Sequence, residues 1–201
     1  MKIQSIDALR RVYAQPGERA VKKQLAHLDA HIQRFIALSP FVVVSSSSAT
    51  QHMDASPRGG APGFVKVGND TTLWLPDASG NNRLDTLENI IATGQIGLLF
   101  LIPGVDETLR VNGHATVSTS PALLAKFSHE ARAPKAVVEV TVREAYLHCA
   151  KAMMRAKLWQ TSSQVERSVL PTMGQMIKDQ AGLDEPAESQ EAMVQRYQSM
   201  L

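Results

Sequence analysis

One run of strict alternation, residues 108–118, limits the folds open to this chain more than any other feature. The apolar residues of this run are Leu109, Val111, Gly113, Ala115 and Val117, and between them lie Arg110, Asn112, His114 and Thr116. Successive side chains of a β-strand point to opposite faces, so the pattern predicts a strand with one face in a core. The other face meets something polar.

Five more segments carry strand signals, namely residues 41–44, 63–67, 71–75, 96–102 and 136–146. They are rich in β-branched and aromatic residues or alternate in polarity. Only one helical crossover is expected between them, so an antiparallel barrel fits better than a parallel doubly wound sheet. Residues 45–62 are predicted to be a long polar loop.

Helical spacing surrounds these strands. Apolar residues recur at three and four from residue 6 to residue 38, where Pro16 and Gly17 divide the pattern into two helices. Further helices are expected at residues 84–93, 121–131, 149–159, 171–181 and 187–201. We therefore expect a single domain over residues 1–201, with N-terminal helices (about 5–38) and C-terminal helices (about 149–200) as appendages.

Composition excludes several classes of protein. The chain has 201 residues, of which 44% are hydrophobic and 20% charged, and a net charge of +2 without a block of like charges, so nucleic acid is not an expected partner. No apolar run approaches the roughly 20 residues that span a bilayer, and no signal core opens the chain, so a cytoplasmic protein is expected. The single cysteine, Cys149, cannot form a disulfide within the chain, and we expect it to be buried.

Two loops carry arginine in a setting suited to anions. In the first, Ser56, Pro57 and Arg58 precede two glycines. In the second, Asn81, Asn82 and Arg83 lie where a helix begins, so free N–H groups and a guanidinium could hold a phosphate. The simpler alternatives are that Arg58 pairs with Asp54 or solvent and that Arg83 pairs with Asp85 or Glu88.

Two further elements could bind an anionic aromatic ligand. Arg110 lies on the polar face of its strand, where the alternative role is a cross-strand ion pair. Lys151, Arg155 and Trp159 are four residues apart and would share one side of a helix, unless this is only a solvated basic face. His27 and His31 have the spacing of two metal ligands, but no third ligand is recognisable and no metal site is expected.

These segments together resemble a known family. The sequence around Asp54-Ala55-Ser56-Pro57-Arg58-Gly59-Gly60, Gly80-Asn81-Asn82-Arg83-Leu84-Asp85, Glu107-Thr108-Leu109-Arg110-Val111-Asn112-Gly113 and Cys149-Ala150-Lys151-Ala152 is similar to a bacterial subfamily of the pyridoxamine 5′-phosphate oxidase-related, FMN-binding proteins. The resemblance covers roughly residues 25–180 in order.

The resemblance implies a mainly β fold with flanking helices, a six-stranded antiparallel split β-barrel, in a homodimer with FMN at the interface. It implies that Ser56, Pro57 and Arg58 line the flavin and its phosphate, that Asn81, Asn82 and Arg83 hold the phosphate, and that Arg110 supports the groove. Lys151, Arg155 and Trp159 would come from the second chain toward the ring.

The expected function is that of an FMN-dependent oxidoreductase, which transfers electrons between a small substrate or nicotinamide donor and an acceptor. The sequence lacks the Arg-x-Val-Leu-Leu-Lys stretch of the vitamin B6 oxidase itself, so that reaction is not expected. The alternatives are a non-catalytic flavin-binding or sensing protein, whose terminal helices dock a partner, and a split barrel that binds haem or a deazaflavin.

Overall fold

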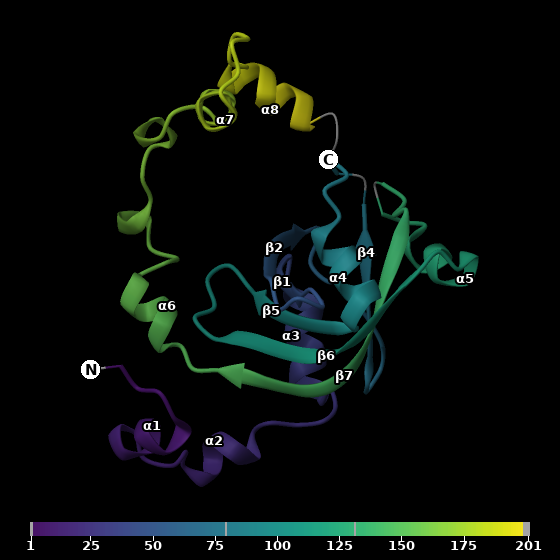
Figure 1. Ribbon diagram of the computed structural model, residues 1–201. Helices are drawn as coiled ribbons and strands as arrows, with labels where there is room; N and C mark the ends of the chain where they lie inside the picture. Colours follow the sequence, from purple (N-terminus) through teal and green to yellow (C-terminus); the bar gives the residue numbers. More distant parts are fainter. Residues whose placement is uncertain (1, 79, 131, 199–201) are drawn as a thin grey trace.

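A single antiparallel sheet forms the centre of the molecule in the computed structural model, which describes residues 2–78, 80–130 and 132–198. Seven strands follow one another in the order β2-β1-β5-β6-β7-β4-β3. Figure 1 shows that the long strands β6 and β7 curve strongly across the molecule. The strands are β1 (Phe41–Ser47), β2 (Met53–Gly59), β3 (Lys66–Asn69), β4 (Thr72–Asp77), β5 (Gln95–Leu101), β6 (Thr108–Ser118) and β7 (Ala136–His148).

The expected antiparallel, mainly β architecture is present, but the expected count of six strands is corrected to seven. The additional strand, β2, pairs along its whole length with β1 and lies in the predicted loop. Asp54, Ser56 and Arg58 alternate along β2 with Met53, Ala55 and Pro57. Pro57 has no N–H for a sheet ladder and is tolerated because β2 is an edge strand. Within the described residues no ladder joins β2 to the other edge strand, β3, so the sheet is open.

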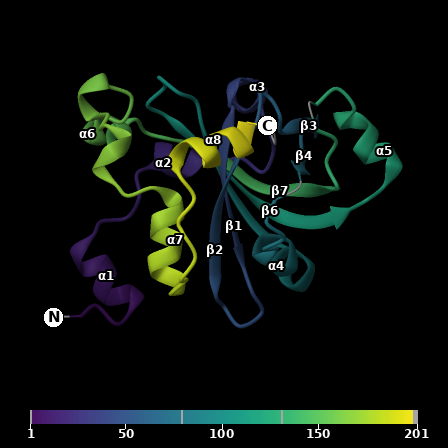
Figure 2. The same ribbon diagram turned by 90° about the horizontal axis from the view of Figure 1, so that it is seen from above.

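The helices lie at the two ends of the chain and between the strands. They are α1 (Ile6–Val12), α2 (Glu18–Lys22), α3 (Ala30–Leu38), α4 (Asp85–Thr93), α5 (Pro121–Leu124), α6 (Lys151–Ala156), α7 (Met173–Ala181) and α8 (Gln190–Gln198), with 3₁₀ turns at Ala125–Phe127, Thr161–Ser163 and Arg167–Val169. Figure 2 shows α1, α6 and α7 on one side of the sheet and α5 on the other.

The predicted helix over residues 17–38 is broken in the middle. Leu25 forms an antiparallel bridge with Ala145, and the two residues exchange backbone hydrogen bonds of 3.0 and 2.8 Å. This pairing with β7 replaces helical bonds across residues 24–29. Helix α3 then begins at Ala30 and is capped by Asp29, whose side chain accepts a hydrogen bond from the N–H of Ile32 at 2.8 Å.

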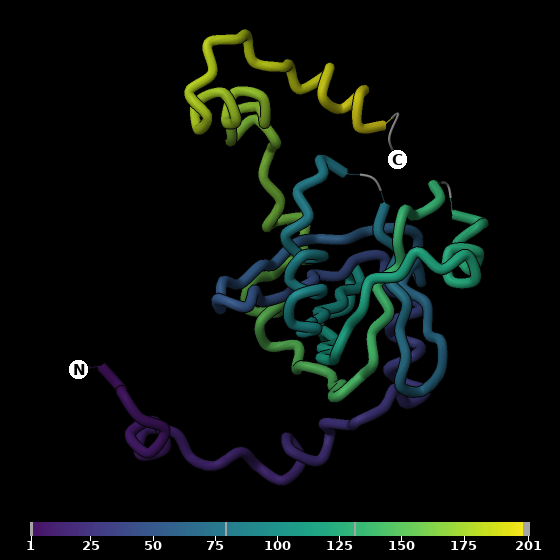
Figure 3. Tube along the Cα trace, turned by 45° about the vertical axis from the view of Figure 1, so that its right-hand side comes forward, coloured from purple at the N-terminus to yellow at the C-terminus, as the bar shows by residue number. Residues whose placement is uncertain are grey.

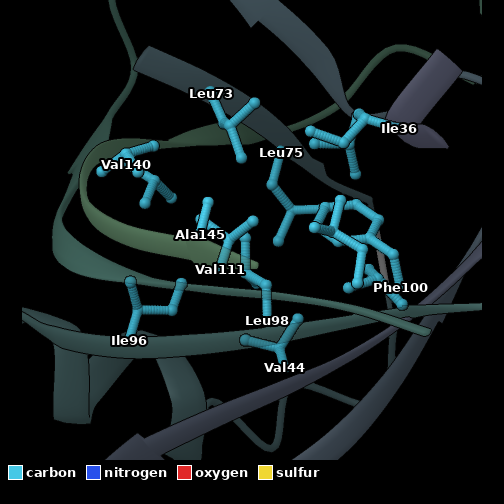
Figure 4. Close-up of a cluster of buried hydrophobic side chains, with 14 of the residues drawn as sticks. Ile36, Val44, Leu73, Leu75, Ile96, Leu98, Phe100, Val111, Val140 and Ala145 are labelled. Carbon is cyan, nitrogen blue, oxygen red and sulfur yellow. The ribbon is translucent and has the colours of Figure 1, made fainter. Parts of the chain in front are cut away.

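The core fills the concave side of the sheet and is covered by α3 and α4. Ile36 of α3 and Ile90 of α4 are almost fully buried, as are Val44, Leu98 and Phe100 on the strands beneath them. Figure 4 shows these strand side chains converging with Ile36. The alternating face of β6 predicted from the sequence points into this core, where Leu109 and Val111 are fully buried.

The C-terminal region differs from the prediction at both ends of α6. Cys149 is exposed rather than buried, because β7 ends at His148 and the chain leaves the sheet there. Helix α6 ends at Ala156, since Lys157 adopts a left-handed conformation with φ of 50°. The expected helix 187–201 is present as α8, although residues 199–201 lie outside the described residues. Across the described chain, every helix is too short or too polar to cross a bilayer.

Candidate functional site

A groove with a volume of about 660 Å³ opens where three segments of the chain meet. These segments are the end of β2, the connection from β4 to α4, and the residues that lead into β7. The charged and amide side chains on its walls include Arg58, Asp77, Asn81, Asn82, Arg83, Arg132 and Lys135. Basic groups outnumber acidic ones in this lining, which suits an anion.

The first wall holds Arg58 on β2. Its Nη1 donates to the Oγ of Ser56 and to the carbonyl oxygen of Pro57, both at 2.9 Å. Ser56 is in turn 3.0 Å from the hydroxyl of Thr86 on α4, and Thr86 donates to a carboxylate oxygen of Asp54. These hydrogen bonds hold the Arg58 side chain in one orientation, in which it lines the groove.

The second wall is the approach to α4. The side-chain oxygen of Asn81 accepts a hydrogen bond from the backbone N–H of Arg83 at 3.0 Å, and Asn82 has a φ of 60°. Leu84 precedes α4 without a side-chain cap, so the first amides of the helix have no side-chain acceptor there. The prediction that asparagines and an arginine lie at a helix N-terminus is confirmed.

Arg83 also makes the ion pair that was considered as its alternative role. Its Nε donates to Asp85 at 2.6 Å, and this hydrogen bond is the main reason that the pKa of Arg83 is raised. The Arg83 side chain is 78% exposed, so the pair is worth little to stability. Breaking this pair so that Arg83 can bind an anion in the groove therefore costs little free energy.

The third wall adds charges that sequence reasoning missed. Asp77 at the end of β4 and Lys135 before β7 both line the groove. Burial raises the pKa of Asp77, although Arg58 and Lys135 act in the opposite direction. Strand pairing brings these residues together, because Asp77 lies opposite Ala136 in the β4–β7 ladder. A single sequence gives no signal for this pairing.

Arg110 does not line this groove. Its Nη1 donates to the hydroxyl of Tyr146 on the neighbouring strand at 2.8 Å, and its guanidinium lies 5.5 Å from the ring centre. The predicted polar, cross-strand position is correct, but the partner is a tyrosine instead of an acid. Two more side chains lie beside the Tyr146 ring. The Nζ of Lys23 is 5.4 Å from the ring centre, and the centre of the His148 ring is 5.0 Å from it.

The expected row of Lys151, Arg155 and Trp159 on one helix is corrected. Lys151 and Arg155 are exposed on α6, but Trp159 follows the end of the helix. The indole N–H of Trp159 donates to the carbonyl oxygen of Val105 at 2.9 Å, which ties it to the connection before β6. In one chain, none of these three residues lines the groove that holds Arg58 and Arg83.

Comparison with known proteins assigns a family to the part of the chain that forms the groove. Residues 28–149 match the family model described as pyridoxamine 5′-phosphate oxidase. Two crystal structures of HupZ from group A Streptococcus superpose with TM-scores of 0.51 and 0.50, both at 18% identity, over 60% and 59% of this chain and 99% and 92% of theirs. An FMN-binding protein from Syntrophomonas wolfei has a TM-score of 0.45 at 10% identity, over 57% of this chain and 81% of its own. No curated protein matches significantly.

Proposed function

The chain belongs to the pyridoxamine 5′-phosphate oxidase family, and from this membership we propose that it is an FMN-dependent oxidoreductase that binds the FMN phosphate between Arg58 and Arg83. The observation that carries the proposal is the meeting of these two arginines in one groove, although they belong to different elements. A flavin would supply hydride or electron transfer when bound. The protein would bind it, orient it and control access to it.

The walls of the groove fit a phosphate monoester. Such a group carries a charge of about −1.5 to −2 at neutral pH and offers three acceptor oxygens. Arg58 and Lys135 supply positive charge, and the amides near Asn82 supply N–H donors at the start of α4. Arg83 can offer a guanidinium fork in place of its exposed bond to Asp85.

The groove also fits the apolar part of such a cofactor. Pro57, Phe64 and Leu84 line it beside the charged residues. Binding sites for cofactors commonly combine apolar walls with a few placed polar groups. A ligand with a phosphate at one end and an aromatic ring at the other matches this lining better than inorganic phosphate alone.

We further propose that the site is completed in a homodimer. Arg110, Lys151, Arg155 and Trp159 do not line the groove of their own chain. Arg110 is near the end of β7, and α6 starts just after that strand. A second chain that presents this region to the groove would bring the two sets of cations to one cofactor, with a small-molecule substrate above it.

Titration of the purified protein with FMN, followed by the quenching of flavin fluorescence, tests the phosphate assignment. Arg58→Ala and Arg83→Ala should each weaken binding by at least about tenfold, since each removes a charged donor from the phosphate. Arg34→Ala, on the exposed side of α3, is the matched control and should leave binding unchanged. Equal FMN affinity in all three variants would remove the groove as the phosphate site.

Reduction under anaerobic conditions separates an oxidoreductase from a flavin-binding protein. NADH or NADPH is added to the FMN-loaded protein, and flavin absorbance is followed before and after an acceptor is supplied. Bleaching followed by repeated reoxidation supports the oxidoreductase. Tight FMN binding with neither nicotinamide donor able to bleach it would favour the non-catalytic binding protein.

A further inference from the structure

Both ends of the chain form arms that pack poorly on their own molecule. The N-terminal arm is residues 2–23, with α1 and α2, and the C-terminal arm is residues 157–198, with α7 and α8. These four helices contain no buried residue. Figures 1 and 3 show both arms reaching away from the sheet, the first in purple and the second in yellow-green.

The accessible surface shows how much of the molecule is left uncovered. The chain exposes 13610 Å². A compact monomer of 21.9 kDa exposes about 9,300 Å². The excess of about 4,300 Å² exceeds the roughly 800 Å² per partner that a standard stable interface buries, and also the roughly 1,000–2,500 Å² per partner of an obligate dimer. The arms thus carry enough free surface to form a permanent interface.

Much of this surface is apolar. On the N-terminal arm, Ile6 is 72% exposed and Val12 64%, and on the C-terminal arm, Val165 is 73% exposed and Val169 61%. Helices of five to nine residues are marginal in water unless an apolar face is packed against a partner. The arms therefore need a covering surface in order to keep the helices that they form.

The two arms have opposite charge. The N-terminal arm has a net charge of +4. It contains two anions, Asp7 and Glu18, and six cations, Lys2, Arg10, Arg11, Arg19, Lys22 and Lys23. The C-terminal arm has a net charge of −2, because its six anions, Glu166, Asp179, Asp184, Glu185, Glu188 and Glu191, outnumber its four cations, Lys157, Arg167, Lys178 and Arg196. Each arm is thus electrostatically complementary to the other arm.

Both arms begin near the end of β7 but run away from each other. Lys23, at the end of the N-terminal arm, donates from Nζ to the carbonyl oxygen of Leu147 at 2.6 Å. Leu147 lies next to the last residue of β7, His148, after which the chain continues into α6. Figures 1 and 3 show the arms leaving this region in opposite directions, so the arms of one chain do not meet.

We propose that each N-terminal arm packs against the C-terminal arm of a second copy of the chain. Two such contacts, related by a twofold axis, would cover the apolar residues of all four arms and pair their opposite charges. The inference rests on the homodimer of the proposed function and adds the segments that clasp it. A second copy is the partner that we infer, because the same chain carries both complementary surfaces.

Charge reversal on the full-length chain tests the arm contact. Arg11→Glu with Arg19→Glu reverses charge on the N-terminal arm, and Glu185→Lys with Glu191→Lys does so on the C-terminal arm; all four residues are exposed. Sedimentation velocity over a dilution series should show a dimer dissociation constant raised by about tenfold or more in each variant. The charge-preserving Arg11→Lys with Arg19→Lys is the matched control and should behave like the parent chain.

Two rescue measurements decide whether the contact joins different chains. A chain with all four reversals should regain the parent dissociation constant. An equimolar mixture of the two reversed chains should form mixed dimers in preference to either homodimer, as native mass spectrometry of differently tagged chains would show. The proposal would be overturned if reversing the charge of one arm did not weaken the dimer. It would also be overturned if the mixture of the two reversed chains showed no preference for mixed dimers.

FMN titration of the same samples keeps this test separate from that of the proposed function. If the arms act as proposed but FMN does not bind, the flavin assignment fails alone. If FMN binds to a dimer that is indifferent to arm charge, the arm contact fails alone. A parent chain that stays monomeric with FMN present would overturn both the arm contact and the proposed shared site.

Discussion

The backbone N–H of Lys135 donates a hydrogen bond to the carbonyl oxygen of Asp77 at 2.9 Å, which fastens two walls of the groove to each other. The bond continues the β4–β7 ladder by one residue beyond the paired strands. A cation and a carboxyl group therefore enter the groove from neighbouring segments of the same chain, the end of β4 and the residue before β7. The position of both charges is set by the sheet and not by a flexible loop.

Asp77→Asn should strengthen FMN binding at neutral pH. The Asp77 carboxylate repels an anion in the groove, and removal of one unit charge at a partly exposed site changes binding by roughly 1 kcal/mol, or about fivefold. Fluorescence titration measures the effect. Asp106→Asn, away from the groove lining, is the control and should change affinity far less.

The raised pKa of Asp77 should also make the free energy of unfolding depend on pH. Because the pKa of Asp77 is raised by burial, the folded state holds this proton more tightly than the unfolded state. Its contribution to stability is present at acid pH and is lost as the pH rises through the folded-state pKa. Urea unfolding of the parent chain and Asp77→Asn across the acid range should give curves that differ in this slope, whereas parallel curves would contradict the shift.

Thr86→Val should destabilise the fold by about 1–3 kcal/mol, since it removes the buried hydroxyl that contacts both Asp54 and Ser56. Thr86 is only 5% exposed, and its hydroxyl donates to Asp54. Urea unfolding gives the change in free energy. Thr50→Val makes the same substitution in an exposed turn and should cost less than about 0.5 kcal/mol.

Gly94→Ala should cost more than Gly104→Ala, although both glycines have positive φ values, of 67° and 86°. The left-handed backbone alone costs an alanine about 1 kcal/mol at either position. At Gly94 the new methyl group would also collide with the imidazole of His114, whereas nothing lies within 4 Å at Gly104. Thermal unfolding should rank the variants in this order, and adding His114→Ala to Gly94→Ala should recover part of the loss.

Arg110→Ala should raise the pKa of His148. Burial lowers the pKa of this imidazole, and the positive charges of Arg110 and Lys23 lower it further. Because the folded state resists protonation of His148, its stability falls as the pH drops through the unfolded-state pKa. NMR titration of the histidine ring protons measures the shift, with Arg34→Ala as a variant in which the pKa of His148 should not change.

Apolar patterning was enough to predict most of the sheet. The strands at residues 41–44, 71–75 and 108–118 have apolar faces that the core requires, and each of them is present. Strand β2 could not be predicted in this way, because its exposed and half-buried residues are held by pairing with β1 and not by burial. The helix break at Leu25 has the same origin, in a contact with Ala145 far along the chain.

The candidate site was predictable where its residues lie close in sequence. Arg58 and Arg83 stand out because each follows a distinctive local motif, and both line the groove. Asp77 and Lys135 reach the groove through the pairing of β4 with β7, which local sequence does not encode. Trp159 was misplaced for a local reason, since the left-handed Lys157 ends the helix and redirects the indole toward Val105.

Pro57 has a consequence that extends beyond the site it lines. Open sheet edges are templates on which foreign strands can grow, and unchecked growth leads to aggregation. A proline in the middle of the edge strand β2 withholds one of the N–H groups that an incoming strand would need. The edge of the sheet formed by β2 is thereby less able to pair with an eighth strand.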